Sequence, residues 1–450
     1  MKTNFFEAST KPVMTKRRVL IVVSSYAPAM IADMQRARML AWELPKLGWE
    51  VEILAPNSRF QNPSCLDTDS EGFFPPNVTV HSFDEWFPLI FSKLKMRSIG
   101  WRALRPLRSH GLKLLESGRF DLVFFSTTQF CLFLAGPFWW KRTGIPYVLD
   151  FHDPCYKEQR GPVETTRHPF KHGITRRLLK YIELWVVQEA SALVSVSPLY
   201  VEVLKARYES IRPAWFKEHL CPTIPFGARE EDLLEGRRLL SPRDGHASEV
   251  LRLIYVGAGG GIMIRAFTLI CQALAVLRQQ GNPLVSRVRI ELFGTTPVWR
   301  KGDLKHLEQV AIDQGVGDLV KEYPERASYR RSLELLLEAD GTLILGVDDA
   351  GYMPSKLFSY VLSGHPLLAS LRRESPAYAH FQATPGLGHA LWFNAQGEMP
   401  VLDAASEVGI FLEEVAVRQT FDRRAILEPN LAPAMAQRHA ELFEAILVKN

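Results

Sequence analysis

The sequence predicts an α/β protein in which two Rossmann-like domains face each other across a cleft. Both halves of the chain alternate short apolar runs, typical of buried parallel strands, with amphipathic helical segments. A charged segment at 229–249 that also contains Gly, Pro and Ser separates the halves, as a linker does. The length of 450 residues allows two domains that each bury a core of ordinary size.

The N-terminal half opens with a strand at 18–24, a helix at 34–47 that ends at Gly48, and a strand at 49–55. This spacing is that of a Rossmann-like unit. The unit lacks the glycine fingerprint of a dinucleotide site, so we expect no NAD. The half continues with strands at 78–80, 120–126, 146–151 and 192–198, and with helices at 130–142, 183–190 and 199–208.

The C-terminal half opens with a strand at 251–257, and the turn 258–261 leads into a helix at 266–279. Further strands are expected at 288–294, 320–323, 342–346 and 367–370, with helices at 304–314, 329–337, 406–417 and 433–448.

A site for an anion is predicted between the last two of these strands. Pro354 suits the first turn of a short helix, and Gly364 suits its C-terminal cap. A helix N-terminus favours an anion, and Lys356 adds a positive charge. The stretch therefore predicts a site for a diphosphate.

Several stretches resemble, in the same order, motifs of GT-B glycosyltransferases of the large retaining "glycosyltransferase group 1" family, which is family 4-like. The matching residues are Arg36, Leu40, Ala41, Leu44 and Gly48; Asp150, His152 and Asp153; Ile224, Pro225 and Gly227; and Pro354-Ser355-Lys356-Leu357-Phe358-Ser359-Tyr360 with Gly364 and Pro366. Each motif is weak alone, but their order over about 350 residues is specific.

The resemblance implies the GT-B fold and divides the chain into four parts. They are a flexible leader at 1–17, an acceptor domain at 18–220, a nucleotide-sugar domain at 221–430, and a terminal helix at 431–450 that returns toward the first domain.

Site residues are also implied by the resemblance. His152 and Asp153 are expected at the catalytic centre, with a helix N-cap and a hydrogen-bonded turn as the alternative. Ala29 and Arg36 are expected on the acceptor side, and no metal ligand is expected. The residues expected to bind the donor are Gly257, Gly259, Gly260, Arg265, Gly351, Tyr352, Met353, Pro354, Ser355, Lys356 and Ser359.

Three features depart from the family pattern. The glycine pair of the first loop is replaced by the residues 29–32. The family's Arg and Lys after the strand at 251–257 are replaced by Ala258 and Met263, and Arg265 is the basic residue nearby. The family's paired glutamates fall on Gly351 and Ser359. Two carboxylates of the preceding loop are candidates to compensate, with solvated turn residues as the alternative: Asp348 and Asp349.

The activity implied by the resemblance is transfer of a sugar from a nucleotide-diphosphate sugar to an acceptor hydroxyl, in the manner of a hexosyltransferase. The family's enzymes retain the anomeric configuration and need no bound metal, so no cofactor besides the donor substrate is expected. The expected setting is the biosynthesis of a polysaccharide, glycan or glycoconjugate. Two alternatives stay open: a noncatalytic GT-B relative that binds a glycan or a partner, and a nucleotide-sugar 2-epimerase.

A segment at 89–113 is rich in basic and aromatic residues, and it indicates which partners the protein could bind. It fits an amphipathic segment on anionic lipid, and the alternative is an ordinary helix whose basic face lies in water. No recognition motif accompanies the charge, so we expect no nucleic acid. We expect a glycan or lipid-linked acceptor.

The expected location is the cytoplasm, with peripheral attachment to the inner face of the membrane as an open possibility. Five scattered cysteines lack metal-ligand spacing, which favours reduced thiols. No apolar run approaches the roughly 20 residues that span a bilayer.

Overall fold

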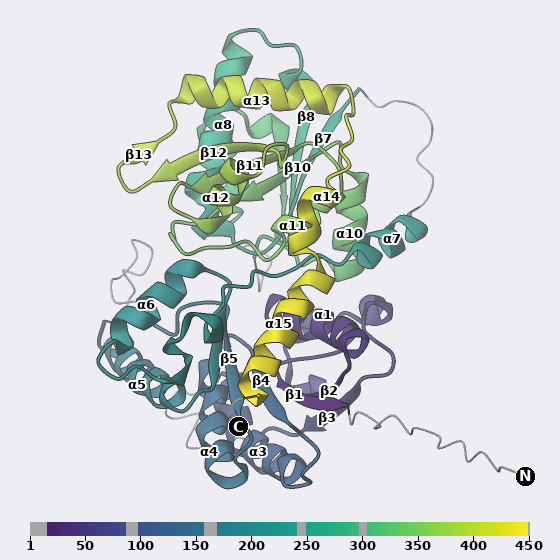
Figure 1. Cartoon of the computed structure of the whole chain (residues 1–450). Helices are drawn as coiled ribbons and strands as arrows, with labels where there is room; N and C mark the ends of the chain where they lie inside the picture. The colour runs from purple at the N-terminus through teal and green to yellow at the C-terminus, as the bar shows by residue number, and fades with distance from the viewer. Residues whose placement is uncertain (1–15, 87–97, 157–168, 241–248, 297–303, 449–450) are drawn as a thin grey trace, which may run out of the picture.

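The computed structural model of the protein describes residues 16–86, 98–156, 169–240, 249–296 and 304–448. Two α/β domains lie one above the other, and the chain crosses between them twice (Figure 1). The two predicted Rossmann-like domains are thereby confirmed.

The N-terminal domain is built on a six-stranded parallel sheet in the order β3-β2-β1-β4-β5-β6. Apolar side chains fill the central strands, and all five residues of β4 are buried. The strands are β1 (Arg17–Val22), β2 (Trp49–Pro56), β3 (Thr79–Phe83), β4 (Leu122–Ser126), β5 (Tyr147–Phe151) and β6 (Ala192–Ser195). The helices are α1 (Gln35–Glu43), α3 (Ile99–Leu115), α4 (Ala135–Thr143), α5 (Pro169–Gln188) and α6 (Pro198–Tyr208).

The C-terminal domain is built on a seven-stranded sheet in the order β13-β12-β11-β10-β7-β8-β9, in which only β13 is antiparallel. Its strands are β7 (Leu251–Val256), β8 (Val288–Phe293), β9 (Val320–Tyr323), β10 (Gly341–Leu345), β11 (Leu367–Arg372), β12 (His389–Asn394) and β13 (Gly397–Glu398). Its helices are α8 (Ile264–Gln279), α9 (His306–Asp313), α10 (Tyr329–Glu338), α11 (Leu357–Leu362), α12 (Pro376–Ala383) and α13 (Val401–Ala416).

One helical stretch of the described residues, Gly260–Gln279, is long and apolar enough to cross a membrane by length and composition. It is not a continuous apolar run in the sequence, because Arg265 and Gln272 interrupt it. Much of its surface is buried, since α8 packs against α13 and β11. A core helix of an α/β domain has this same composition.

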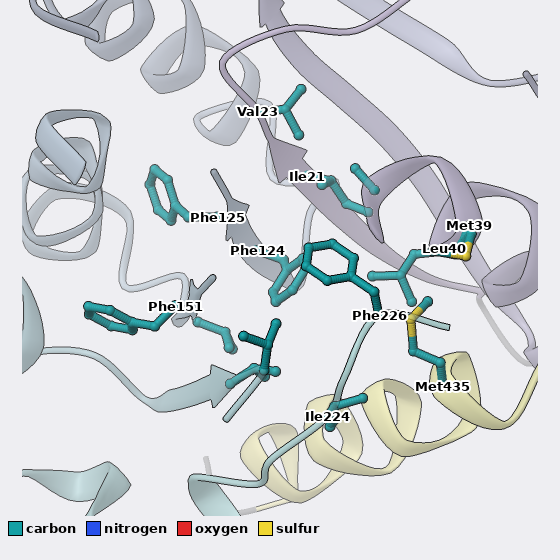
Figure 2. Close-up of a cluster of buried hydrophobic side chains, with 14 of the residues drawn as sticks. Ile21, Val23, Met39, Leu40, Phe124, Phe125, Phe151, Ile224, Phe226 and Met435 are labelled. Carbon is teal, nitrogen blue, oxygen red and sulfur yellow. The ribbon is translucent and has the colours of Figure 1, made fainter. Parts of the chain in front are cut away.

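The chain returns to the N-terminal domain through α14 (Arg424–Leu427) and α15 (Ala432–Leu447), which run down from the upper domain in Figure 1. At the crossing, Ala228 accepts a hydrogen bond from Ala432 N at 2.7 Å, so the two crossing segments lie side by side. In α15, Phe443 packs its ring 5.4 Å from Trp49 and 5.5 Å from Phe124. Figure 2 shows Met435 of α15 beside Phe226 in the same buried cluster.

Two predicted elements differ in the structure. The segment 229–249 contains a helix, α7 (Glu230–Leu239), because three acidic residues in its first turn and two arginines in its last turn match the helix dipole. The helix after Pro354 has only six residues and begins at Leu357, with the preceding residues in a turn closed by the Leu357 N–H to Pro354 O at 3.2 Å. Gly364 takes φ of +84° after α11, as predicted for its cap.

Candidate functional site

A cavity of about 390 Å³ lies between the two domains. The N-terminal domain contributes Met30 and Arg38, and the linker contributes Arg229. The larger share comes from the C-terminal domain, where the ends of β7 and β10, the loop after β9 and the start of α11 meet. The cavity therefore sits at the carboxyl ends of parallel strands, which is where open α/β sheets bind ligands.

Lys356 is held at the end of β7 by the residues of its own motif. Its Nζ donates to the carbonyl oxygen of Val256 at 2.8 Å. Tyr360, four residues later, donates its hydroxyl to the same oxygen at 2.9 Å and accepts the Val256 N–H at 2.7 Å. Because residues four apart lie on one side of a helical turn, the Lys-x-x-x-Tyr spacing fixes both groups on the cavity wall.

The charge of Lys356 is not neutralised by the part of the chain that the structure describes. No ion pair joins it to a carboxylate within the described ranges. The residue is solvent-accessible where it lines the cavity, but the surrounding protein displaces enough water to disfavour the ammonium form. This desolvation, followed by the charge of Arg326, lowers the pKa of Lys356 from 10.5 to about 8.

Arg326 is a second cation on the cavity wall, and it belongs to none of the predicted site motifs. It lies in the loop between β9 and α10. Its guanidinium donates to the carbonyl oxygen of Ser64 at 3.2 Å and to that of Met30, both in the N-terminal domain. A signal was available: a basic residue in the loop that follows a parallel strand lies on the ligand-binding edge of the sheet.

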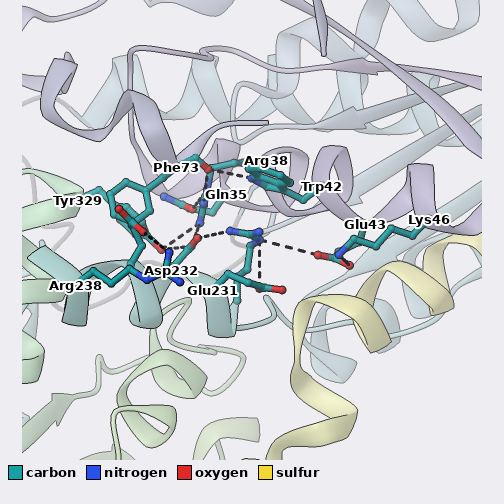
Figure 3. Close-up of polar contacts among 12 residues, drawn as sticks. Gln35, Arg38, Trp42, Glu43, Lys46, Phe73, Glu231, Asp232, Arg238 and Tyr329 are labelled. Atoms are coloured by element: carbon teal, nitrogen blue, oxygen red, sulfur yellow. Dashed lines mark hydrogen bonds and ion pairs between the residues drawn. The ribbon is translucent and has the colours of Figure 1, made fainter. Parts of the chain in front are cut away.

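The third and fourth cations of the cavity are neutralised by carboxylates (Figure 3). Arg38 binds Asp232 of α7 at 2.5 Å, and Arg229 binds the same carboxylate at 2.8 Å. The hydroxyl of Tyr329 donates to Asp232 at 2.7 Å. Burial opposes the charge of Asp232, but Arg38 and these hydrogen bonds lower its pKa. Helices of both domains and the linker therefore meet in one buried polar cluster.

The N-terminal domain also caps α10 of the other domain. The carboxylate of Asp67 accepts the Tyr329 N–H at 2.5 Å, and Ser70 Oγ accepts the Arg330 N–H at 3.1 Å. Free N–H groups in the first turn of a helix need such partners. The contacts hold the loop that carries Arg326 against the N-terminal domain.

The predicted catalytic residue His152 lies in a buried charged cluster at the carboxyl ends of β4 and β5, outside the cavity wall. Its Nε2 lies 2.6 Å from Asp150 and 3.2 Å from Ser126 Oγ. Asp150 in turn pairs with Arg36 at 2.7 Å, with both side chains fully buried. Burial raises the pKa of Asp150, but Arg36 and His152 outweigh it and lower the pKa to about 2.

Arg36, predicted on the acceptor side, is a buried structural residue. It donates to the carbonyl oxygen of Ile224 at 2.7 Å, and its guanidinium lies 4.8 Å from the ring of Phe226. It thus fastens the first crossing segment to α1. Ala29 is buried beside this helix and does not line the cavity, whereas its neighbour Met30 does.

Asp153 lies at the junction of the two domains. It is exposed, and its charge acts on Tyr200 of α6 and on Tyr352 of the C-terminal domain. Burial, followed by Asp153, raises the pKa of Tyr352 to about 12. Tyr352 lines the cavity, so the charge of Asp153 acts on a residue of the cavity wall.

Six of the eleven predicted donor residues line the cavity, and they are Gly257, Tyr352, Pro354, Ser355, Lys356 and Ser359. Five do not, and they are Gly259, Gly260, Arg265, Gly351 and Met353. Arg265 binds the β12–β13 hairpin instead, through Glu398 at 3.1 Å and the carbonyl oxygen of Asn394 at 2.6 Å. Its guanidinium is thereby occupied away from the cavity.

The carboxylates expected to compensate for the missing glutamates are also occupied. Asp348 binds Arg372 at 2.5 Å. Asp349 accepts the Gly351 N–H at 2.8 Å in a tight turn. Neither residue lines the cavity.

Gly351 stands where the first family glutamate would be, and the structure leaves no space for a side chain there. A Cβ at this position would lie 2.1 Å from Cε1 of the buried Tyr200. The position is therefore filled from the opposite domain.

We expect Gly351→Ala to destabilise the protein by roughly 1–3 kcal/mol, because Tyr200 or the loop must shift. Denaturation monitored by tryptophan fluorescence measures the change. Gly397→Ala is the matched control, because a Cβ there meets nothing within 4 Å. Equal stability of the two variants would contradict the tight packing.

Comparison with known proteins agrees with this architecture. Residues 35–214 match the model of Glycosyltransferase Family 4. No curated protein matches the sequence. Sucrose-phosphate synthase from Thermosynechococcus elongatus is similar in structure, with a TM-score of 0.59 and 13% identity over 96% of this chain and 100% of that chain.

Two further structures are similar over nearly the whole chain. HepE from Anabaena, in complex with UDP-glucose, has a TM-score of 0.57 at 15% identity, covering 95% of this chain and 99% of that chain. An alpha,alpha-trehalose-phosphate synthase (UDP-forming) from Burkholderia vietnamiensis has a TM-score of 0.58 at 11% identity, covering 95% and 100%. The match at 35–214 gives the N-terminal half a Glycosyltransferase Family 4 region, and the two Rossmann-like domains that enclose a cavity, similar to these structures over nearly the whole chain, show the GT-B fold.

Proposed function

We propose that the protein transfers a sugar from a nucleotide-diphosphate sugar to an acceptor hydroxyl, with retention of configuration and without a resident metal. The observation that carries the proposal is Lys356, a cation bonded to a backbone carbonyl on the wall of a cavity that six predicted donor residues line. HepE, which is similar in structure, forms complexes with UDP-glucose and with UDP, and this makes a UDP-sugar the first donor to test.

The chemical role of the cavity follows from charge. When the sugar leaves its donor, negative charge develops on the diphosphate, and cations placed beforehand stabilise it. Lys356 and Arg326 supply that charge from the protein. Asp153 is proposed to act on the side of the transferred sugar, because its charge acts on Tyr352 of the cavity wall, whereas His152 is proposed to act only indirectly, from its buried cluster outside the wall.

A panel of nucleotide sugars tests the proposal. The protein is incubated with UDP-, GDP-, ADP- and dTDP-sugars in the presence of EDTA, and products are followed by NMR. We expect slow hydrolysis of one donor, with release of its nucleoside diphosphate and a sugar of unchanged anomeric configuration. Conversion of a donor into its 2-epimer would instead show an epimerase.

Gly351 favours a second candidate, a noncatalytic relative that binds a glycan or a partner. Its contact with Tyr200 excludes the carboxylate that the family places there. Binding of a nucleotide sugar with neither hydrolysis nor transfer would support this candidate.

The acceptor is proposed to be lipid-linked and to belong to the biosynthesis of a glycan or glycoconjugate at the cytoplasmic face of a membrane. Part of the predicted basic segment lies outside the described residues, and the described part is engaged: Arg102 pairs with Glu85 and Arg105 stacks on Trp86. The support comes from α5, which exposes 71% of Tyr181 and 45% of Trp185. Arg177 and Lys180 flank these rings and are exposed. Aromatic side chains beside cations suit the surface of anionic lipid.

We expect the protein to bind vesicles that contain phosphatidylglycerol and to release them at high salt. Insertion of the aromatic side chains and attraction of the cations to anionic lipid are both weak, and salt screens the attraction. Tyr181→Ser with Trp185→Ser should reduce cosedimentation several-fold. A variant with Lys93, Lys95, Arg97, Arg102 and Arg105 changed to Gln tests the basic segment in parallel. No binding by the wild type would indicate a soluble acceptor.

A further inference from the structure

We propose that Arg326 is the second cation of the diphosphate site and that, through it, donor binding is coupled to the contact between the domains. The inference rests on the proposed function and names a residue that the family pattern does not supply. Arg326 supplies the positive charge that the family's basic residues after β7 would supply.

The first observation is the difference among the four cations of the cavity. Arg38 is paired with Asp232, and Arg229 is paired with Asp232, Glu231 and Glu43, so carboxylates already balance both positive charges. Lys356 and Arg326 bind only backbone carbonyl oxygens among the described residues. An uncompensated pair of positive charges in one cavity favours a ligand that carries more than one negative charge.

The proximity of the two cations is the second observation. The charge of Arg326 disfavours the protonated form of Lys356, so the two groups repel each other when the cavity holds no anion. An anion between them would relieve this repulsion and gain two charge-assisted hydrogen-bonding partners. A diphosphate, with several acceptor oxygens, can engage both groups.

The third observation is that the two positions after β7 where the family has Arg and Lys hold no basic residue in this chain. Ala258 and Met263 carry no charge. The Met263 sulfur lies 3.0 Å from the hydroxyl of Tyr255 and fills the space inside the turn. Arg265 is bound to Glu398. Of these loops, the one after β9 is the one that brings a guanidinium to the cavity.

The link to the N-terminal domain follows from the donor geometry of arginine. A guanidinium has five N–H donors in a planar fork. Two nitrogens of Arg326 donate to Met30 and Ser64 of the N-terminal domain. The remaining N–H groups are enough for a phosphate, so a single side chain can bind the diphosphate and the opposite domain together. Occupancy of the site then strengthens the contact between the domains.

Calorimetry on the full chain with UDP and with uridine tests the inference. We expect Arg326→Gln to weaken UDP binding about ten- to a hundred-fold, the range for loss of a charge-assisted hydrogen bond, with uridine binding unchanged. Arg326→Lys should recover part of the affinity, since it restores the charge without the fork. Arg330→Gln is the matched control: it removes a cation from the same segment, and that cation is paired with Glu334.

A pH series tests the electrostatic coupling between Arg326 and Lys356. Pyrophosphate, as a second ligand, separates failure of this inference from failure of the proposed function. Without Arg326, the pKa of Lys356 should rise, so the loss of UDP affinity at alkaline pH should move to higher pH. The tyrosines facing Lys356 stay neutral in this range, because the protein raises the pKa of Tyr352 to about 12 and those of Tyr255 and Tyr360 further.

If the wild type binds UDP and Arg326→Gln binds it equally, the inference is wrong and the proposed function stands. If the wild type binds no nucleoside diphosphate, the proposed function fails, and inorganic pyrophosphate then tests the cation pair directly. Wild-type binding of pyrophosphate that Arg326→Gln loses would support the pair, and equal binding would refute it. A melting temperature equal to that of Arg330→Gln confirms that the variant is folded.

Discussion

Replacing Lys356 by methionine is expected to lower the affinity for a nucleoside diphosphate about a hundred-fold and, at the same time, to stabilise the ligand-free protein. The affinity falls because a charge-assisted phosphate contact is lost. The stability rises because methionine has a similar length and removes a cation that the surrounding protein desolvates and that pairs with no carboxylate among the described residues. Functional sites commonly carry such a cost to stability.

The stability of the ligand-free protein and its affinity for UDP should change with pH in opposite directions. The pKa of Lys356 is about 8 in the folded protein against 10.5 for the free side chain. Between these values the unfolded chain binds more protons, so the stability of the wild type should increase from pH 8 to pH 10.5. Over the same window UDP affinity should fall about tenfold per pH unit, because the ammonium form is required. Lys356→Met should show neither trend.

Calorimetry and thermal denaturation between pH 7 and 10 provide the measurements. Lys321→Met is the matched control, since Lys321 is an exposed cation of the same domain that does not line the cavity. An affinity of Lys356→Met equal to that of the control would remove Lys356 from the site.

Breaking the buried pair of Arg36 and Asp150 is expected to produce the largest loss of stability. Arg36→Met leaves Asp150 without its principal cation in a fully buried position, which costs roughly 3–5 kcal/mol. It also removes the hydrogen bond to Ile224 that fastens the crossing segment. Denaturation in urea measures the change.

The double variant Arg36→Met with Asp150→Leu distinguishes a charge effect from general disruption. We expect it to be less destabilised than the sum of the single variants, because no unpaired charge remains. The Asp150 contribution to stability is present above its ordinary pKa near 3.8 and is lost as the pH falls through about 2. Strict additivity would contradict the coupling.

Local sequence rules predicted much of the fold because buried parallel strands are nearly continuous apolar runs. The strands at 49–55 and 146–151 lie within a residue of β2 and β5. Gly364 was predicted correctly because a left-handed cap follows directly from its missing side chain. The helix α7 was missed although its acidic start and basic end were visible, because its segment was interpreted by charge alone.

The residues of the candidate site also differ in whether local sequence could predict them. Lys356 was placed on the cavity by a motif whose residues are close in sequence, and Tyr360 holds it from the next turn. Arg326 was missed because it is thirty residues away, and its role depends on how the ends of β7 and β9 meet. Arg265 was predicted from its distance along the chain, yet the hairpin β12–β13 binds it.

The two alternating α/β halves, the turn that carries Lys356 and the absence of the paired glutamates could be predicted from the sequence, because each depends on residues that are neighbours along the chain. Which cations of the cavity are paired with carboxylates depends on the packing of the two domains. A carboxylate from α7 neutralises Arg38, whereas Arg326 reaches the cavity with backbone carbonyls as its partners. Coulomb interactions and desolvation depend on distance in space, and the packing of the two domains sets those distances.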